Sequence, residues 1–105
     1  MDDSLDVSQQ YTFSPPLDLL SALESLNIQY LDVTETRTLV NFKAAILNLE
    51  SNEGPLTTLS SAEIMVYELP RHTNTDDPEN EAISVIEKFI DQITSAEMTT
   101  ASRHE

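Results

Sequence analysis

The sequence contains no cysteine and a single glycine among 105 residues. The absence of cysteine excludes disulfide bonds, thiolate metal sites and thiol catalysis. Because glycine-rich phosphate loops need several glycines, the lone Gly54 excludes the familiar nucleotide-hydrolysing motifs. Long apolar runs are also missing: a run such as residues 44–47 is far shorter than the ~18 residues of a membrane-spanning helix. We therefore expect no membrane partner and no cofactor.

Basic residues are scarce. Five lysines and arginines stand against nineteen aspartates and glutamates, which gives a formal charge of −14 and an isoelectric point near 4.1. Such a chain repels nucleic acid and anionic membranes, so no direct nucleic-acid partner is expected. The first residues include Asp2, Asp3 and Asp6 where a secretory signal would carry basic and then apolar residues. We expect a cytoplasmic or nuclear protein.

Apolar periodicity predicts a mainly helical fold. Ser14 is a suitable N-cap, with two prolines in the first turn and leucines at helical spacing up to a stop at Asn27. A second helix is predicted over residues 34–49, with Leu39 and Phe42 on one face. The third and best-supported helix spans residues 78–97, because Asp76 or Asp77 caps it, a proline occupies its first turn and a long apolar stripe follows.

Two shorter segments are ambiguous. Residues 28–33 are rich in β-branched and aromatic side chains, which favours a strand. Ser60 and Glu63 have the spacing of a capping box, but residues 61–69 fit a short helix and a strand equally well. A cluster of turn-forming residues at 50–55 separates the second helix from this segment.

The predicted fold is thus mainly α, a small bundle of three to four helices with one or two short strands; the alternative is a small α+β fold. The sequence divides into a flexible acidic arm (1–13), a single helical domain (14–97) and a disordered tail (98–105), since the ends lack an apolar face.

No catalytic or metal-binding residue is predicted. His72, two aspartates and two glutamates lie within about ten residues, but a calcium loop that starts at Asp77 would have Ala82 in place of the required glycine. The same loop would have Lys88 in place of its final acid. The acids are explained by helix capping and by the helix dipole, so we expect no metal site. His72 lies in a loop and His104 in the tail, and no serine lies in a glycine-flanked nucleophile turn, so we expect no enzymatic activity.

These exclusions favour a non-enzymatic protein–protein interaction module, a small acidic subunit or regulator of a larger complex. Surplus apolar surface on so small a chain favours a protein partner or a homodimer. The predicted partner-binding residues form the stripe of the last helix: Ile83, Ile86, Phe89, Ile90 and Ile93. The alternative is an inhibitor whose acidic surface mimics DNA and occupies the groove of a DNA-binding protein.

Residues 69–76 (LPRHTNTD), followed by residues 86–91 (IEKFID), resemble a segment of the small stalk subunit of eukaryotic RNA polymerase I. In that family a Leu-Pro turn leads into an amphipathic helix that docks on the larger stalk partner. The resemblance implies a transcription assembly and a docking role for the same helix stripe.

Overall fold

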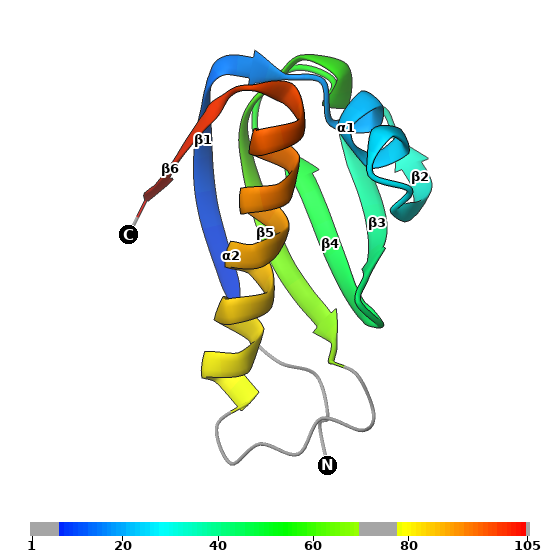
Figure 1. Ribbon diagram of the computed structural model, residues 1–105, viewed down its shortest axis with the longest axis vertical. Coiled ribbons are helices and arrows are strands. Elements are labelled where there is room, and N and C mark those ends of the chain that lie inside the picture. The colour runs from blue at the N-terminus through cyan, green and yellow to red at the C-terminus, as the bar shows by residue number, and fades with distance from the viewer. Residues whose placement is uncertain (1–6, 70–77, 105) are drawn as a thin grey trace.

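The computed structural model describes residues 7–69 and 78–104, which form a mixed α+β fold (Figure 1). The elements in chain order are β1 (Ser8–Leu17), α1 (Leu19–Ser25), β2 (Gln29–Thr34), β3 (Arg37–Phe42), β4 (Ala45–Ser51), the 3₁₀ turn η1 (Leu56–Thr58), β5 (Leu59–Glu68), α2 (Pro78–Glu97) and β6 (Thr100–His104). The six strands form one antiparallel sheet in the order β2-β3-β4-β5-β1-β6. The predicted helical bundle is therefore wrong, and a helical protein is not the right description.

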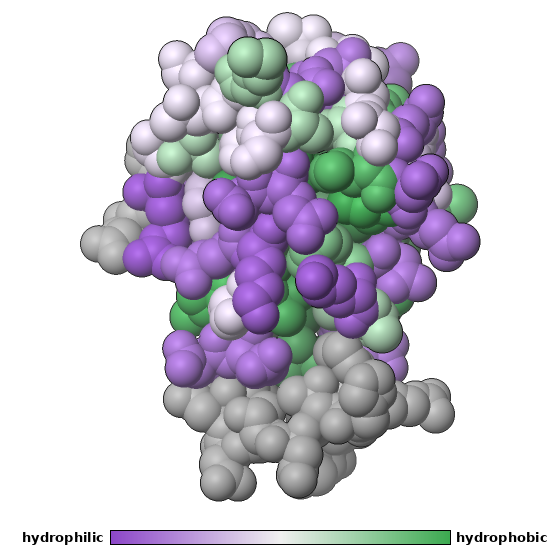
Figure 2. Space-filling model, viewed as in Figure 1, coloured by the Kyte–Doolittle hydropathy of each residue, from purple (hydrophilic) through white to green (hydrophobic). Residues whose placement is uncertain are grey.

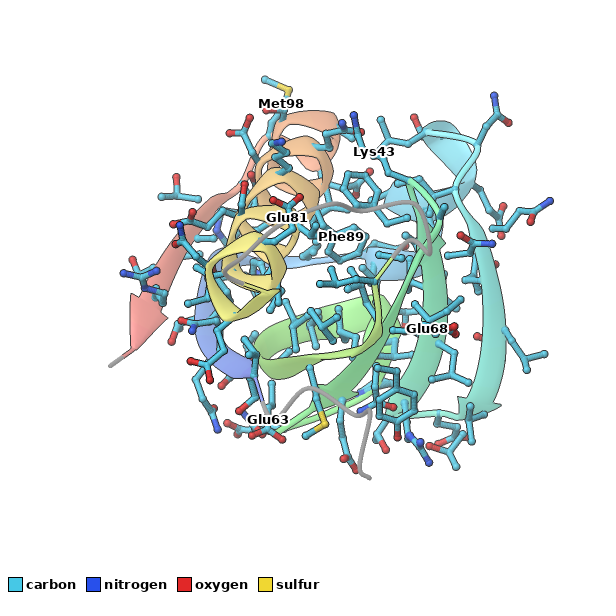
Figure 3. All side chains as sticks on the ribbon, turned by 90° about the horizontal axis from the view of Figure 1, so that it is seen from below. Lys43, Glu63, Glu68, Glu81, Phe89 and Met98 are labelled. Carbon is cyan, nitrogen blue, oxygen red and sulfur yellow. The ribbon has the colours of Figure 1, made fainter. Side chains whose placement is uncertain are left out.

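The described helices lie on one face of the sheet, so the molecule has two layers (Figures 1 and 3). Side chains alternate along each strand, and one set from every central strand packs against α1 and α2 in a single core. Phe89 of α2 meets Phe42 of β3 edge to face, with 5.4 Å between ring centroids. The opposite set of side chains points away from the helices.

The predicted helix over residues 34–49 is wrong, because the segment is the β3–β4 hairpin. Thr38, Val40 and Phe42 alternate toward the core, as do the core residues of β4. The two strands are joined at Lys43 and Ala44, whose φ angles are 51° and 70°. Such left-handed pairs form tight hairpin turns but usually contain glycine or asparagine. Because this turn contains neither glycine nor asparagine, nothing in the sequence marks it. The spacing of the apolar residues over 34–49 is that of one helix face.

The first helix begins later than predicted. Asp18, not Ser14, is its N-cap, and its Oδ1 accepts a hydrogen bond from the backbone N–H of Ser21 at 3.0 Å. Residues 14–17 continue β1 instead. The predicted stop is confirmed, since Asn27 has a φ of 57° and the N–H of Ile28 donates to the carbonyl of Leu23.

The remaining elements divide between confirmed and corrected predictions. The helix over residues 78–97 is confirmed as α2, and the strand predicted at 28–33 is β2. Residues 61–69 lie mainly in β5, so the capping box at Ser60 and Glu63 does not start a helix. The segment forms a strand because its alternate residues Ala62, Ile64 and Val66 all point into the core. The turn at 50–55 includes Gly54 with a φ of 78°.

Both ends of the described chain differ from the predicted arm and tail. Residues 8–17 form β1, which lies inside the sheet between β5 and β6, and Tyr11 and Phe13 are buried. Residues 100–104 form β6 at the sheet edge. The alternation of Val7, Tyr11 and Phe13 was the available signal for β1. Neither helix of the described chain is long and apolar enough to cross a membrane.

Candidate functional site

The predicted partner-binding stripe of α2 forms part of the core. Ile86, Phe89 and Ile93 are fully buried, Ile90 is nearly so, and Ile83 is partly buried against the same cluster. The outer surface of this helix is hydrophilic (Figure 2). A partner could reach the stripe only after α2 had left the sheet, so the stripe is not an accessible binding surface in this fold.

The face of the sheet that points away from α1 and α2 carries an apolar patch at its β2 end. We define the open-face patch as Leu31, Leu39, Ile46, Met65 and Tyr67. Leu31 is 64% exposed and Tyr67 is 42% exposed, whereas the other three are half-buried. Leu31 lies opposite Leu39 in the β2–β3 pair, so the patch is continuous between these strands. Four neighbouring strands thus contribute apolar side chains to one surface.

A hydrogen-bonded arginine organises the centre of this patch. Arg37 donates from Nε to Oδ1 of Asn48 at 2.6 Å and from Nη2 to the hydroxyl of Tyr67 at 2.8 Å. Asn48 is 7% exposed, so its amide oxygen is satisfied within the protein. The guanidinium group therefore fixes the tyrosine ring on the open face instead of leaving it to rotate in solvent.

Carboxylates border the open-face patch. Glu50 and Glu63 are direct cross-strand neighbours on β4 and β5, and Glu68 lies opposite Ile46. Figure 3 shows Glu63 on the side of the sheet away from Phe89 and α2. Like charges that face each other across strands destabilise a sheet, and Arg37, which lies opposite Glu50 on β3, offsets part of this repulsion.

Strand β2 forms one edge of the sheet, and its outer side has no neighbouring strand in the part of the chain that the structure describes. Five of its six residues are exposed. The hydroxyl of Tyr30 donates to Oε2 of Glu24 at 2.8 Å, which ties β2 to α1. This hydrogen bond raises the pKa of Tyr30 above its usual value of 10.0. The edge is therefore held in place from one side and open on the other.

Two hollows flank β2, one on each face of the sheet. The hollow on the open face has a volume of about 310 Å³ and is lined by Gln29, Tyr30, Leu31, Leu39, Val40, Asn41 and Ile46. The hollow beside α1 has a volume of about 540 Å³ and is lined by Leu20, Asp32, Thr34, Glu35, Pro55, Leu56 and Thr57. Its floor is apolar, and its acidic side chains are those of Asp32 and Glu35.

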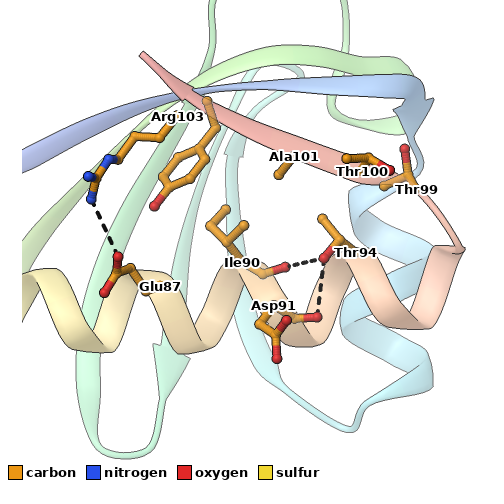
Figure 4. A pocket seen from close by; sticks show the side chains of 9 residues that line it. Glu87, Ile90, Asp91, Thr94, Thr99, Thr100, Ala101 and Arg103 are labelled. Atoms are coloured by element: carbon orange, nitrogen blue, oxygen red, sulfur yellow. Dashed lines mark hydrogen bonds and ion pairs between the residues drawn. The ribbon is translucent and has the colours of Figure 1, made fainter. Parts of the chain in front are cut away.

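A third hollow, of about 510 Å³, lies between α2 and the β1–β6 pair (Figure 4). Arg103 and Glu87 form an ion pair across it at 3.4 Å, and Thr94 donates to the carbonyl of Ile90 at 2.8 Å. Burial raises the pKa of Tyr11 above 10.0, although the nearby guanidinium of Arg103 lowers it. These polar groups bond to one another, so this hollow joins α2 to β6 and is a weaker candidate for a binding site.

The other sequence predictions fall partly outside the described residues. Three of these predictions concern residues 70–77, which lie outside the described residues. They are the helix cap at Asp76 or Asp77, the candidate ligand His72, and residues 70–76 of the segment that resembles the polymerase stalk subunit. Residues 86–91 of that resemblance lie in α2. Among residues 7–69 and 78–104, no group of three histidine, aspartate or glutamate side chains could hold a metal ion.

Sequence reasoning placed Leu31 in a strand and Leu39 in a helix face, so it did not bring the two together as a surface. The missing information was the β3–β4 turn, which sets the strand register. No protein-family model, curated protein sequence or solved structure matches this chain.

Proposed function

We propose that this chain is a non-enzymatic protein–protein interaction module, a small acidic subunit or regulator of a larger complex, which binds its partner through the open-face patch and the adjoining β2 edge. The observation that carries the proposal is the one-sided layering of the fold. Both described helices cover the same face, and the other face keeps Leu31 and Tyr67 exposed.

The energetics support a partner on this face. Burying one fully exposed leucine side chain contributes about 1.5–3 kcal/mol, so Leu31, which is 64% exposed, offers the largest single gain. The other four side chains of the patch are less exposed and contribute less each. Tyrosine and arginine are typical of interface centres, and here Arg37 holds Tyr67 in place before any partner arrives. Such preorganisation lowers the entropy lost on binding.

The charge of the chain favours a different protein over a second copy as the partner. Two copies would each bring a formal charge of −14, and their like charges oppose association. A transcription assembly is the setting implied by the stalk-subunit resemblance. The compartment stays the sequence prediction, the cytoplasm or the nucleus.

Quantitative affinity purification of the tagged full chain tests the proposal. Leu31→Ser removes the most exposed leucine of the open-face patch, whereas Met98→Ser changes an apolar side chain that is 89% exposed at the end of α2. We expect the proteins recovered with the unchanged chain to be depleted by Leu31→Ser and retained by Met98→Ser. Equal recovery with the two variants would contradict binding through the open face.

A further inference from the structure

The β2 edge combines an unpaired backbone with a different hollow on each side. We infer that the partner binds by strand addition: an extended segment with alternating apolar and basic residues pairs with β2 and extends the sheet. This inference rests on the proposed function, because it describes how the partner engages the β2 end of the molecule.

The backbone of β2 offers hydrogen-bonding groups to such a segment. The hydroxyl of Thr38 on β3 donates to the carbonyl oxygen of Leu31 at 3.0 Å, so that carbonyl points toward β3. In a strand the N–H and C=O of one residue point to the same side, and the side alternates along the chain. The backbone groups of Tyr30 and Asp32 therefore point outward, where an added strand can pair with them.

The edge carries only part of the usual protection against pairing. Natural edge strands carry lysine, proline or irregularities that prevent another strand from adding. β2 contains neither lysine nor proline, and its one irregularity, between Asp32 and Thr34, lies toward its end. Residues 29–32 stay in regular register with β3, which provides a template of four residues.

The two hollows specify the side chains of the added segment. Successive residues of a strand point to opposite faces, so every second side chain would lie over the open-face hollow beside Leu31 and Leu39, which accepts an apolar group. The intervening side chains would lie on the α1 side, where Asp32 and Glu35 line the larger hollow. An apolar floor with two carboxylates suits the long stem and cationic end of lysine or arginine.

The local charge agrees with this pattern. β2 and α1 contain no basic residue, and Glu24 adds a third carboxylate on the α1 side through its bond to Tyr30. A basic segment is therefore attracted to the same side on which its cationic side chains would lie. An acidic segment, including β2 of a second copy, would be repelled there.

Synthetic peptides test the inference with the unmodified full chain. The probe is a fluorescent peptide of alternating valine and lysine, and its binding is followed by anisotropy. Its first control carries N-methyl groups on alternate backbone amides, which keeps charge and side chains but removes the hydrogen bonds of one strand edge. We expect the methylated peptide to bind about tenfold more weakly, the loss typical of one or two backbone hydrogen bonds. Equal binding would overturn strand addition.

A pair of variants tests the same point from the protein side. Asp32→Pro removes the outward N–H of residue 32, whereas Asp32→Asn removes the charge and keeps that N–H. Hydrogen–deuterium exchange of the two variants without peptide verifies that each sheet is intact. We expect Asp32→Pro to bind the lysine peptide about tenfold more weakly than Asp32→Asn. Equal affinity would overturn strand addition. A peptide in which glutamate replaces lysine and binds equally well would overturn the basic character of the added segment.

The outcomes separate this inference from the proposed function. If partners are depleted by Leu31→Ser but the peptide results contradict backbone pairing, the open face binds its partner by side chains alone and strand addition is wrong. If Leu31→Ser leaves the partners unchanged, the proposed function itself is wrong. A concentration-dependent dimer in light scattering that Asp32→Pro abolishes would assign the edge to a second copy and overturn the basic segment.

Discussion

Two residues in the β3–β4 turn hold left-handed backbone angles although neither is glycine. Lys43 and Ala44 have φ angles of 51° and 70°, a conformation that costs an L-residue about 1–2 kcal/mol. The hairpin tolerates this cost because the flanking strands pair from Arg37 to Glu50 and bury Phe42 and Ala45. The packing of these two strands thus holds Lys43 and Ala44 in a strained conformation.

Ala44→Gly should stabilise the protein. Glycine removes the steric cost at φ 70° but adds about 0.5–1 kcal/mol of chain entropy, which leaves a gain of about 0.5–1 kcal/mol. Urea unfolding measures the change. Ala45→Gly, one position further on in a buried strand position, is the control and should destabilise the protein. A loss of stability in Ala44→Gly would show that the turn is not strained.

Tyr11 should make stability depend on pH in the alkaline range. Because burial raises its pKa in the folded state, its contribution is complete below the unfolded value of 10.0 and is lost as the pH rises through the higher folded value. Between about pH 9 and about pH 11 the free energy of unfolding should therefore fall, and it should fall less in Tyr11→Phe. Parallel declines in the two proteins would contradict this assignment.

At the scale of elements, the secondary structure predicted from the sequence is correct where the pattern lies within one continuous segment. The helix at 78–97 has its apolar stripe in one uninterrupted segment, and Asn27 ends α1 as its left-handed preference indicates. The β3–β4 hairpin was missed because Leu39, Phe42, Ile46 and Leu49 repeat at helical spacing. In the hairpin, Phe42 and Leu49 face the core, whereas Leu39 and Ile46 lie on the open face. The open-face patch could not be predicted, since it exists only when β2, β3, β4 and β5 are in register.

Removing the aromatic ring of Phe89 should weaken the packing of α2 against the sheet and destabilise the protein. Phe89 is fully buried and packs edge to face on Phe42, so Phe89→Ala should lower the free energy of unfolding by about 3–5 kcal/mol. Chemical denaturation gives the value. Met98→Ala, at an exposed position after the same helix, should change it by less than about 0.5 kcal/mol. A similarly small effect at position 89 would mean that its ring is not part of the core.

At the scale of the whole molecule, a complex held by charge and a complex held by apolar contacts differ in how their affinity depends on salt. Complexes that neutralise many phosphate-like charges weaken steeply in salt, as expected of a DNA mimic. The open-face patch buries apolar side chains and uses few charges, so its complex should depend on salt only modestly.

Ionic strength should therefore discriminate an interaction module that binds through the open-face patch from a DNA mimic. For a partner recovered with the chain, raising the salt from about 50 mM to about 200 mM should weaken binding by less than about tenfold, compared with about 10³–10⁵ for extensive phosphate-like contacts. Calorimetric titration at both concentrations measures the ratio. A loss of several orders of magnitude would favour DNA mimicry over the apolar interface.

The position of β1 inside the sheet has a consequence for synthesis on the ribosome. Gln10 pairs with Glu63 on one side and with His104 on the other, so the first described strand is flanked by two strands that are made long after it. While β2, β3 and β4 can pair as they emerge, β1 remains without its second neighbour until residues 100–104 have also left the exit tunnel. Pairings this distant in sequence also slow folding, so Tyr11 and Phe13, which are buried in the folded protein, stay exposed to aggregation for longer than the side chains of the β2–β4 strands.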